Sequence, residues 1–323
     1  MTLISNDIPS HMERKTPVKI LVFGSLNIDY VMAVDHIIAP GETEKIRTMQ
    51  VFPGGKGLNQ AVAIARAGYP VSLAGNVGAT DGRLLLDTMT EFNIDSSHVR
   101  EHPGLSGSAY IQVDSSAQNC ILIAANANRM NTKASIEEVI SQFVAGDLLL
   151  LQNEINLLNH IVCVAHQRGL RIYLNPSPFN EELQNAPLEW IDGFIFNEIE
   201  GEQLTGEGTP IKILDEMHSR YPHAEHLLTL GAQGAILFHE SKKIYQAAYL
   251  VEPIDTTAAG DTFTGFYLAE TARGSSVNLA LDRAAKAAAI ATTRRGAATS
   301  IPSLQEVVDS GLTCRDRSEY FQE

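Results

Sequence analysis

The sequence predicts an α/β three-layer sandwich, in which helices cover both faces of a mostly parallel central sheet, together with a small β-sheet lid. Two observations predict this fold class. Short aliphatic runs alternate with segments of helical period along most of the 323 residues, and two regions break that alternation. Alternating strands and helices specify a parallel sheet that is buried on both faces. We expect one domain at 17–311, between a flexible tail at 1–16 and a polar tail at 312–323.

The aliphatic runs and the segments between them predict the core elements. LNQAVAIARAG (58–68) carries apolar residues at helical spacing and ends on Gly68, which favours a C-terminal cap. Further helices are expected at 81–92 and 156–168. Strands are expected at VKILVF (18–23), VSLAG (71–75), LLLL (148–151), RIYLN (171–175), GFIF (193–196) and HLLTL (226–230).

Residues 29–52 and 105–125 break the pattern. They contain DYVMAV, TEKIRTMQVF, SAYIQVD and NCILIAA, which favour exposed or half-buried β segments joined by turns over crossover helices. We therefore interpret the two regions as a small β lid inserted into the α/β core.

Composition excludes several classes of partner. The formal net charge is -14, whereas nucleic acids and anionic membranes both require a basic face. Phosphate ligands remain open, because the amides at a helix start bind anions without any lysine. The three cysteines form no CxxC pair, and the start of the chain has no signal-peptide core, so reduced thiols in the cytoplasm are expected.

Common motifs for phosphate, nicotinamide and metal chemistry are missing. PGGKGLNQ places Gly57 after the lysine, where a Walker loop needs Ser or Thr, and FGSLNID after the first strand is not GxGxxG. Neither HExxH nor GxSxG occurs. We interpret His223 and His226 as surface or loop histidines and not as a metal pair.

Polar residues do cluster where predicted strands end, and open α/β sheets bind their ligands there. Seven stretches, in order along residues 18–302, resemble the pfkB, or ribokinase, family of carbohydrate kinases: GSLNIDY, PGETEKIR, GGKGLNQAVA, NPSPFNEEL, FNEIEGEQLTG, TLGAQGA and DTTAAGDTFTGF. The resemblance implies a ribokinase-like fold and an ATP-dependent sugar kinase, with the terminal hydroxyl of D-ribose as the first choice of acceptor. A deoxyribose, other pentose or nucleoside kinase is the alternative within the fold, and a sugar-binding module without turnover is the alternative outside it. Leu58 stands where the family commonly has alanine.

Asp261 matches the family's catalytic base, which accepts the proton of the attacking hydroxyl. A helix N-terminus stabilises negative charge, so Asp261 is expected to be ionised at neutral pH. The amides of Ala259, Gly260 and Asp261 are expected to be unpaired, and Ala259 and Gly260 resemble the family's anion hole. The alternative role for Asp261 is a simple helix cap.

The resemblance also implies a sugar site. Carboxylates and amides each engage two hydroxyls of a furanose, and unpaired buried donors discriminate against the wrong sugar. Taken alone, Asp29 would be a turn residue and Glu154 a solvated loop acid. The positions that match are Asn27, Asp29, Gly55, Lys56, Asn59 and Glu154.

ATP and Mg²⁺ are the implied cofactors. Asn197 and Glu200 resemble the family's NxxE motif, in which Glu200 would manage Mg²⁺; the alternative is an ordinary first turn of a helix. Thr229, Gly231 and Gly234 match positions that hold ATP, although glycines there also suit a tight turn.

Three further expectations rest on the resemblance. The adenine pocket is expected along part of 277–297, without named contacts. Lid strands of two subunits are expected to pair in a homodimer. A monovalent cation, K⁺ by preference, is expected at Asp255, Thr257, Thr292, Arg295, Ala297 and Ser300, several of them through carbonyl oxygens.

Overall fold

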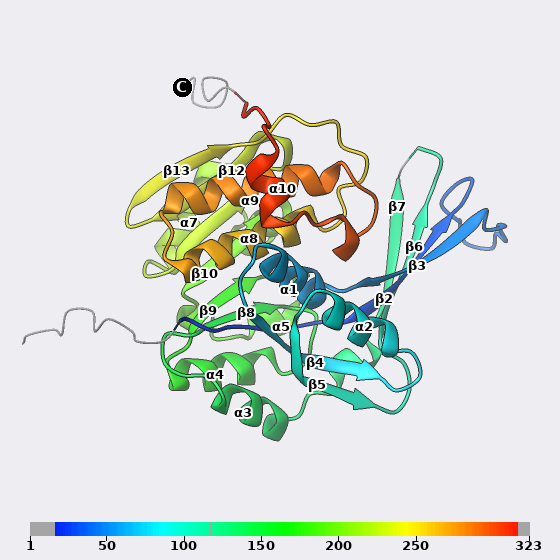
Figure 1. The fold of residues 1–323 in the computed structure, drawn as a ribbon, viewed down its shortest axis with the longest axis horizontal. Helices are drawn as coiled ribbons and strands as arrows, with labels where there is room; N and C mark the ends of the chain where they lie inside the picture. The colour runs from blue at the N-terminus through cyan, green and yellow to red at the C-terminus, as the bar shows by residue number, and fades with distance from the viewer. Residues whose placement is uncertain (1–16, 117, 316–323) are drawn as a thin grey trace, which may run out of the picture.

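The computed structural model describes residues 17–116 and 118–315, so the predicted tail at 1–16 and residues 316–323 lie outside the described residues. Figure 1 shows a broad sheet between helical layers, with a smaller sheet projecting to one side. The predicted fold class is confirmed, because the large sheet is mostly parallel and the second sheet is separate from it.

Within the described residues, nine strands form the central sheet in the order β13-β12-β11-β10-β9-β8-β1-β4-β5. Neighbouring strands are parallel from β11 to β5, and only β12 pairs antiparallel, with β11 and with β13. The strands are β1 (Ile20–Phe23), β4 (Val71–Gly78), β5 (Asp95–His102), β8 (Leu148–Gln152), β9 (Arg171–Asn175), β10 (Gly193–Asn197), β11 (Glu225–Thr229), β12 (Gly234–His239) and β13 (Lys242–Ala247).

Two apolar cores lie on opposite faces of this sheet. In β8, Leu148 and Leu150 pack into one core, whereas Leu149 and Leu151 pack into the other. Successive side chains of a strand point to opposite faces, so a strand that is buried on both sides is apolar at every position. This is why the run LLLL predicts a central strand without any alternation.

Helices supply the rest of each core. One face is covered by α1 (Lys56–Arg66), α2 (Arg83–Glu91), α8 (Ala259–Arg273), α9 (Val277–Thr292) and α10 (Leu304–Asp309). The other is covered by α3 (Lys133–Ser141), α4 (Leu158–Arg168), α5 (Glu181–Gln184), α6 (Glu198–Thr205) and α7 (Pro210–Arg220). Each helix of the described chain is too short or too polar to cross a bilayer.

The edge strand β5 was not predicted. Its sequence, DSSHVREH, has neither an aliphatic run nor a clear alternation, and most of its residues are only partly buried. An edge strand pairs on one side only and tolerates charge there, which also discourages pairing with other chains. The polar composition that protects the edge therefore gives no sequence signal for a strand.

His226 contradicts the expectation of a surface or loop histidine. It lies in β11 with an exposed fraction of 0%, and its ring stacks on Phe194 with centroids 5.7 Å apart. Burial lowers the pKa of His226 to about 4, so the ring is neutral at pH 7, and Nε2 donates to the carbonyl of Tyr221 at 3.1 Å. No three His, Cys, Asp or Glu of the described residues form a metal-binding group.

The lid is a four-stranded sheet in the order β3-β2-β6-β7. Its strands are β2 (Asn27–Ala33), β3 (Thr48–Gly54), β6 (Gly107–Val113) and β7 (Asn119–Ala124), all from the two regions predicted to be β. Tyr30 of β2 stacks on Tyr110 of β6, with ring centroids 5.2 Å apart. Because β2 follows β1 directly, a single segment passes from the core into the lid and carries Asn27 and Asp29 with it.

The first residues of the predicted C-terminal tail return to the domain. The Leu250 amide donates to the Thr313 carbonyl at 3.0 Å, and the Arg315 amide donates to the Ala248 carbonyl at 2.9 Å. This short pairing holds Arg315 beside the end of β13.

Candidate functional site

Polar side chains from separate stretches converge at one edge of the central sheet. Strands β8, β9, β10 and β11 all end there, and α8 begins beside them. The carboxyl ends of parallel strands are where open α/β sheets bind ligands. A polar pocket of about 200 Å³ lies at this edge, and its polar lining includes Lys56, Asn175, Asn197, Glu200, Thr229 and Asp261.

Two glycines allow the start of α1 to approach the lid. A Cβ on Gly54 would lie 2.0 Å from the Asp29 carboxylate, which sits across the β2–β3 ladder. Gly55 has φ 91°, and a Cβ there would also lie 2.8 Å from the backbone nitrogen of Asn27. Only glycine meets both conditions without strain. The motif GGK therefore sets Lys56 at the first position of the helix, next to the lid strand.

Asp261 lies in the first turn of α8 and is held from α1. Its Oδ2 accepts a hydrogen bond from Asn59 Nδ2 at 3.0 Å, and its Oδ1 accepts one from Gln60 Nε2 at 2.8 Å. No side chain caps α8, so the simple-cap alternative for Asp261 does not describe its contacts. The carboxylate instead faces the helix that follows the glycine-rich loop.

One detail of the expected anion hole is wrong. The Ala259 amide is not unpaired, because it donates to the Thr256 carbonyl at 3.2 Å. Ala258 adopts a left-handed φ of 58°, and this turn brings the Thr256 carbonyl within reach. Within the described chain, the amides of Gly260 and Asp261 meet no backbone carbonyl, so Gly260 is the better donor of the pair. Such amides at a helix start are aimed at any anion that lies before the helix.

Carboxylates dominate the electrostatics of the pocket. Burial, together with the charges of Glu154 and Asp261, raises the pKa of Asp29 to about 7. Burial alone would lower the pKa of Lys56, but Asp261, Glu154 and Glu200 together outweigh it and the pKa is raised. The lysine is therefore charged beside the carboxylates of Asp261, Glu154 and Glu200, and its ammonium offsets their mutual repulsion.

Glu154 links the end of β8 to the glycine-rich loop. Its Oε2 accepts from Ser25 Oγ at 2.5 Å and from the Lys56 amide at 3.4 Å. The side chain of Asn27 is fixed by Asn128, because the Asn27 oxygen accepts a hydrogen bond from Asn128 Nδ2 at 2.7 Å. The Asn27 amide nitrogen therefore points away from Asn128 as a fixed donor.

Asn197 and Glu200 form the reciprocal start of α6. The Glu200 amide donates to Asn197 Oδ1 at 2.9 Å, and the Asn197 amide donates to Glu200 Oε2 at 3.0 Å. This is the capping box named as the alternative, and both side chains also line the polar pocket. The two roles coexist because a carboxylate accepts more hydrogen bonds than the cap uses.

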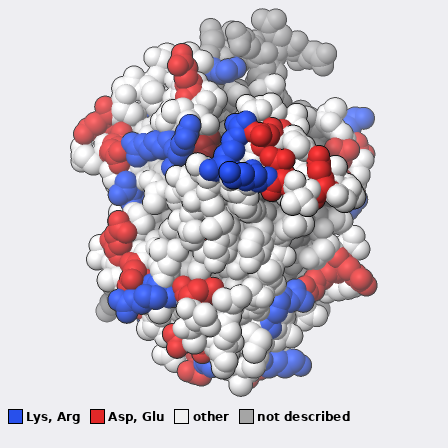
Figure 2. Space-filling view, turned by 90° about the vertical axis from the view of Figure 1, so that its right-hand side faces the viewer, with Lys and Arg blue, Asp and Glu red and all other residues white. Residues whose placement is uncertain are grey.

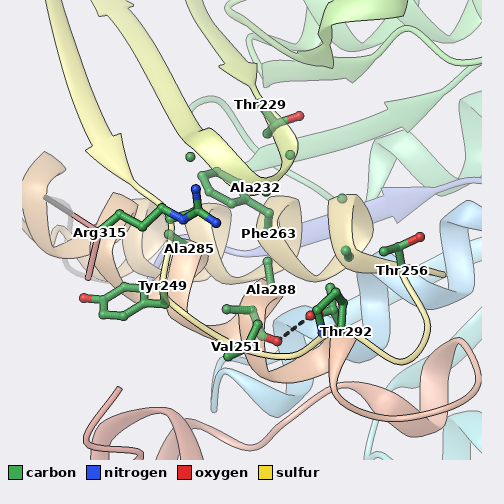
Figure 3. A pocket seen from close by; sticks show the side chains of 17 residues that line it. Thr229, Ala232, Tyr249, Val251, Thr256, Phe263, Ala285, Ala288, Thr292 and Arg315 are labelled. Atoms are coloured by element: carbon green, nitrogen blue, oxygen red, sulfur yellow. Dashed lines mark hydrogen bonds between the residues drawn. The ribbon is translucent and has the colours of Figure 1, made fainter. Parts of the chain in front are cut away.

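A second, mostly apolar cavity of about 360 Å³ adjoins the first (Figure 3). Small side chains of α9 form one wall, the turn at Gly231 and Gly234 forms another, and Arg315 reaches toward it from the C-terminal segment. Thr229, Thr256, Ala259 and Gly260 line both cavities. The start of α8 thus lies between an apolar cavity and a polar pocket.

The residues of the expected cation site converge, but they fit a cation incompletely. Asp255 accepts from the amides of Thr257 and Gly296, at 2.9 and 3.0 Å. The Thr292 carbonyl already accepts the amides of Ile254 and Asp255, and the Ala297 carbonyl accepts both the amide and the hydroxyl of Ser300. A carbonyl has two lone pairs, so neither offers a further one to a cation. Arg295 adds positive charge beside Asp255.

Sequence reasoning missed four residues that shape the site. Gln60 and Asn175 were overlooked although each follows a signal that was used: Gln60 follows Asn59 in the glycine-rich motif, and Asn175 ends the predicted strand RIYLN. Asn128 lies in a stretch without periodicity, and Arg315 lies in a predicted tail, so nothing local marked either residue.

The comparisons agree with this arrangement. The model of the pfkB family of carbohydrate kinases matches residues 18–304. A ribokinase of Haemophilus influenzae is 34% identical over 92% of this chain and 98% of its own, and a deoxyribokinase of Salmonella typhi is 28% identical over 89% and 96%. The structure of Arabidopsis thaliana ribokinase complexed with ribose and ATP superposes with a TM-score of 0.79 at 28% identity, covering 91% of this chain and 98% of that one.

The layers, the lid and the convergent edge define the ribokinase-like class of α/β folds. Within that class, the chain belongs to the pfkB family of carbohydrate kinases.

We predict that Asp29→Asn stabilises the protein in a pH-dependent way. The folded-state pKa of about 7 exceeds the ordinary 3.8, so the stability associated with neutral Asp29 is lost as the pH rises from 3.8 through 7. The neutral amide should therefore increase the free energy of unfolding in urea by about 4 kcal/mol at pH 8 and by less than half of that at pH 5.

The matched control is Glu101→Gln, which neutralises an exposed carboxylate on β5 and should change stability little at either pH. An Asp29→Asn gain that is equal at pH 5 and pH 8 would contradict the raised pKa.

Proposed function

We propose that this kinase transfers the γ-phosphoryl group of ATP to the terminal hydroxyl of D-ribose and yields D-ribose 5-phosphate. The observation that carries the proposal is the position of the start of α8, with Asp261 in its first turn, between a polar pocket and an apolar cavity. Full-length similarity to ribokinases supports ribose as the acceptor.

The apolar cavity suits a nucleotide base. Its α9 wall comprises Ala285, Ala288, Ala289 and Thr292, whose small side chains leave room for a planar ring. A base in this cavity would place its phosphates toward Ala259 and Gly260, where the two cavities meet. Thr229, Gly231 and Gly234 line the apolar cavity, which supports their proposed role in holding ATP.

The polar side suits a ligand with several hydroxyl groups. Asp29 Oδ1 and Asn59 Oδ1 are buried acceptors without a hydrogen-bond partner in the described structure. Leaving such an atom unpaired costs roughly 1–3 kcal/mol, and sugar hydroxyls would supply the missing donors. Asn27, Gly55, Lys56 and Glu154 surround these acceptors and complete the proposed sugar site.

Asp261 is the proposed base. As the terminal hydroxyl attacks the γ-phosphorus, its proton passes to the Asp261 carboxylate and the bond to the β-phosphate oxygen breaks, releasing ADP. The Gly260 amide would stabilise the charge on the transferring group, and Lys56 would balance the charge of Asp261. The contacts from Asn59 and Gln60 hold the carboxylate in one orientation while the proton moves.

Mg²⁺ remains a proposal that the donor set supports. Glu200 lines the polar pocket beside the proposed phosphate path, and one carboxylate plus phosphate oxygens and water is a usual Mg²⁺ environment. The ion would neutralise charge on the phosphates. K⁺ remains a prediction from family resemblance alone, because the carbonyls of Thr292 and Ala297 are already occupied, and no step depends on it.

The lid supports the proposed homodimer. On the edge strand β7, Ile121, Leu122 and Ile123 are exposed by 49%, 64% and 57%. Ile121 and Ile123 lie on the face of the sheet that carries Asp29, because the register aligns them with Ile111 and Ala109. On the side of the molecule that carries the lid, a broad central area is free of charged side chains (Figure 2). An unpaired apolar edge of this kind invites a second copy.

Two further expectations stay proposals. All three cysteines lie in the described residues and none forms a disulfide, which supports the expected cytoplasmic location without testing it. We likewise propose that residues 17–311 form one domain.

The transfer is tested by measuring ATP consumption with ribose, 2-deoxyribose, other pentoses, hexoses and nucleosides. We expect ribose to be the best acceptor, and Asp261→Asn to lower kcat by about 10²–10⁴-fold because it removes the proton acceptor. Sugar affinity should persist, since Asp261 is assigned to the reaction and not to binding.

Asp309→Asn, at the exposed end of α10, is the matched control and should leave kcat unchanged. If another acceptor is preferred, that acceptor replaces ribose as the proposed substrate. If ribose binds and no acceptor is phosphorylated, the protein is a sugar-binding module and not a kinase. Near-normal turnover by Asp261→Asn would remove its assigned role.

Arg315→Ala should weaken ATP binding selectively. The guanidinium flanks the apolar cavity at the end away from the proposed phosphates, where it can stack on the face of a base. We expect KM for ATP to rise about two- to fivefold, the range for an exposed cation–π contact, with KM for ribose unchanged. Lys133→Ala on α3 removes a distant surface cation as the control. An unaltered KM for ATP in Arg315→Ala would show that the C-terminal segment does not contact the nucleotide.

The double substitution Ile121→Lys with Ile123→Lys should dissociate the dimer. Sedimentation of the wild type is expected to give twice the chain mass of 35.1 kDa, and the charged variant should sediment as the single chain because like charges would meet at the interface. Val308→Lys, an exposed apolar residue of α10, is the control and should remain dimeric. A wild type that sediments as a monomer at all concentrations would refute lid pairing.

A further inference from the structure

Two buried glutamines form a chain of hydrogen bonds that ends on Asp261. Gln60 of α1 and Gln152, the last residue of β8, are both 0% exposed. Gln152 Nε2 donates to Gln60 Oε1 at 2.5 Å, and Gln60 Nε2 donates to Asp261 Oδ1 at 2.8 Å. The donors therefore point in one direction, from the core of the sheet toward the carboxylate.

The direction of the chain follows from the chemistry of its last member. An ionised carboxylate only accepts hydrogen bonds, so Gln60 must turn its NH₂ group toward Asp261. Its carbonyl oxygen then faces Gln152, which must in turn present its own NH₂ group. A glutamine at 152 thus supports the orientation that Asp261 imposes on the Gln60 amide, because it donates to the Gln60 oxygen, and linked hydrogen bonds of one sense reinforce each other.

Packing gives no separate reason for an amide at position 152. Gln152 Oε1 has no hydrogen-bond partner in the described structure and lies against Gly24, where even a Cβ would approach it to 2.0 Å. A buried acceptor without a partner destabilises a fold, and an apolar side chain of the same length would avoid that cost. The polar group is present at an energetic loss, and its one hydrogen bond is the bond to Gln60.

We propose that Gln152 and Gln60 are positioning residues, which orient the Asp261 carboxylate for proton transfer from the buried side. The proposal rests on the proposed function of Asp261 as base. Asn59 also donates to Asp261, but from the side of the proposed sugar site, where its own oxygen is assigned to a hydroxyl. Gln60, which is 0% exposed, is thus the contact that reaches Asp261 from the buried side.

The charged groups that act on Asp261 from neighbouring elements are Lys56 of α1 and Asp29 of β2. Glu154 and Glu200 act on the same lysine. These four charged residues remain in place when Gln60 or Gln152 is replaced. A change at the Asp261 carboxylate after such a replacement therefore reports the lost amide donor.

The test compares Gln60→Met, Gln152→Met and the double variant with the wild type. Because a donor to the ionised form is lost, we expect Gln60→Met to move the acid limb of the kcat profile upward by about one pH unit and to lower kcat about 10- to 100-fold. KM for ribose and ATP should stay within twofold. Gln152→Met should show the same changes to a smaller extent, although residue 152 does not touch Asp261. The double variant should be no worse than Gln60→Met, because Gln152 acts through Gln60.

Gln142→Met, an exposed glutamine after α3, is the control and should match the wild type. Additive losses in the double variant, or an acid limb that does not move, would reduce both glutamines to structural residues. Circular dichroism and thermal melts would identify a variant that fails to fold. Gln152→Met, which leaves every contact of Asp261 in place, then carries the test alone.

A second readout separates this proposal from the proposed function. The ¹³C carboxyl resonance of Asp261, assigned by its absence in Asp261→Asn, should have a different chemical shift at pH 8 in Gln60→Met and Gln152→Met than in the wild type, because the hydrogen bond to Oδ1 is lost or altered. This measurement needs no turnover. If the resonance shifts while the wild type phosphorylates no acceptor, the kinase proposal fails and the positioning role stands. If the wild type is active and the resonance does not shift, the positioning role fails alone.

Discussion

The site depends on one partly buried cation, Lys56, that three carboxylates share. Asp261, Glu154 and Glu200 raise the pKa of Lys56 against the effect of burial, while Glu154 and Asp261 also raise the pKa of Asp29. Without the lysine, the carboxylates of the lid, the β8 loop and α8 would repel one another across the pocket. Lys56 reaches this point because it is the first residue of a helix that follows two glycines. The glycine-rich motif therefore positions a charged lysine here, and it is not a Walker-type phosphate loop.

The same arrangement lowers the free energy of unfolding through groups at the site. Within the described structure, Asp29, Asn59 and Gln152 each bury an oxygen that lacks a hydrogen-bond partner, and Asp29 folds with a strongly raised pKa. The sheet compensates, because β1 and β8 are apolar at nearly every position and fill the cores on both of its faces. A rigid, doubly buried sheet can hold unsatisfied groups in place until a ligand with matching donors arrives.

The sequence allowed prediction of the residues whose signals are local. LLLL marks a strand buried on both faces, and GGKGLN marks a turn followed by a helix start, so the core and Lys56 were predictable. Asp29 and Asp261 were named through family resemblance, whereas their hydrogen bonds depend on pairs some two hundred residues apart, such as Gln60 with Asp261. β5 could not be predicted because its residues, like those of many edge strands, are mostly polar. Arg315 escaped because its position depends on backbone pairing with Ala248, which composition does not indicate.

The two cavities differ in chemistry because their walls come from different layers. α9 packs alanines against the sheet and leaves an apolar slot, whereas the strand ends and the lid contribute amides and carboxylates. Within the described residues, the cavities share the end of β11, the turn before α8 and the first two residues of α8. In the proposed function, a group that passes between the cavities would pass the Gly260 amide and come near Asp261. The proposed transfer would then take place beside main-chain donors that the mutation of a side chain does not remove.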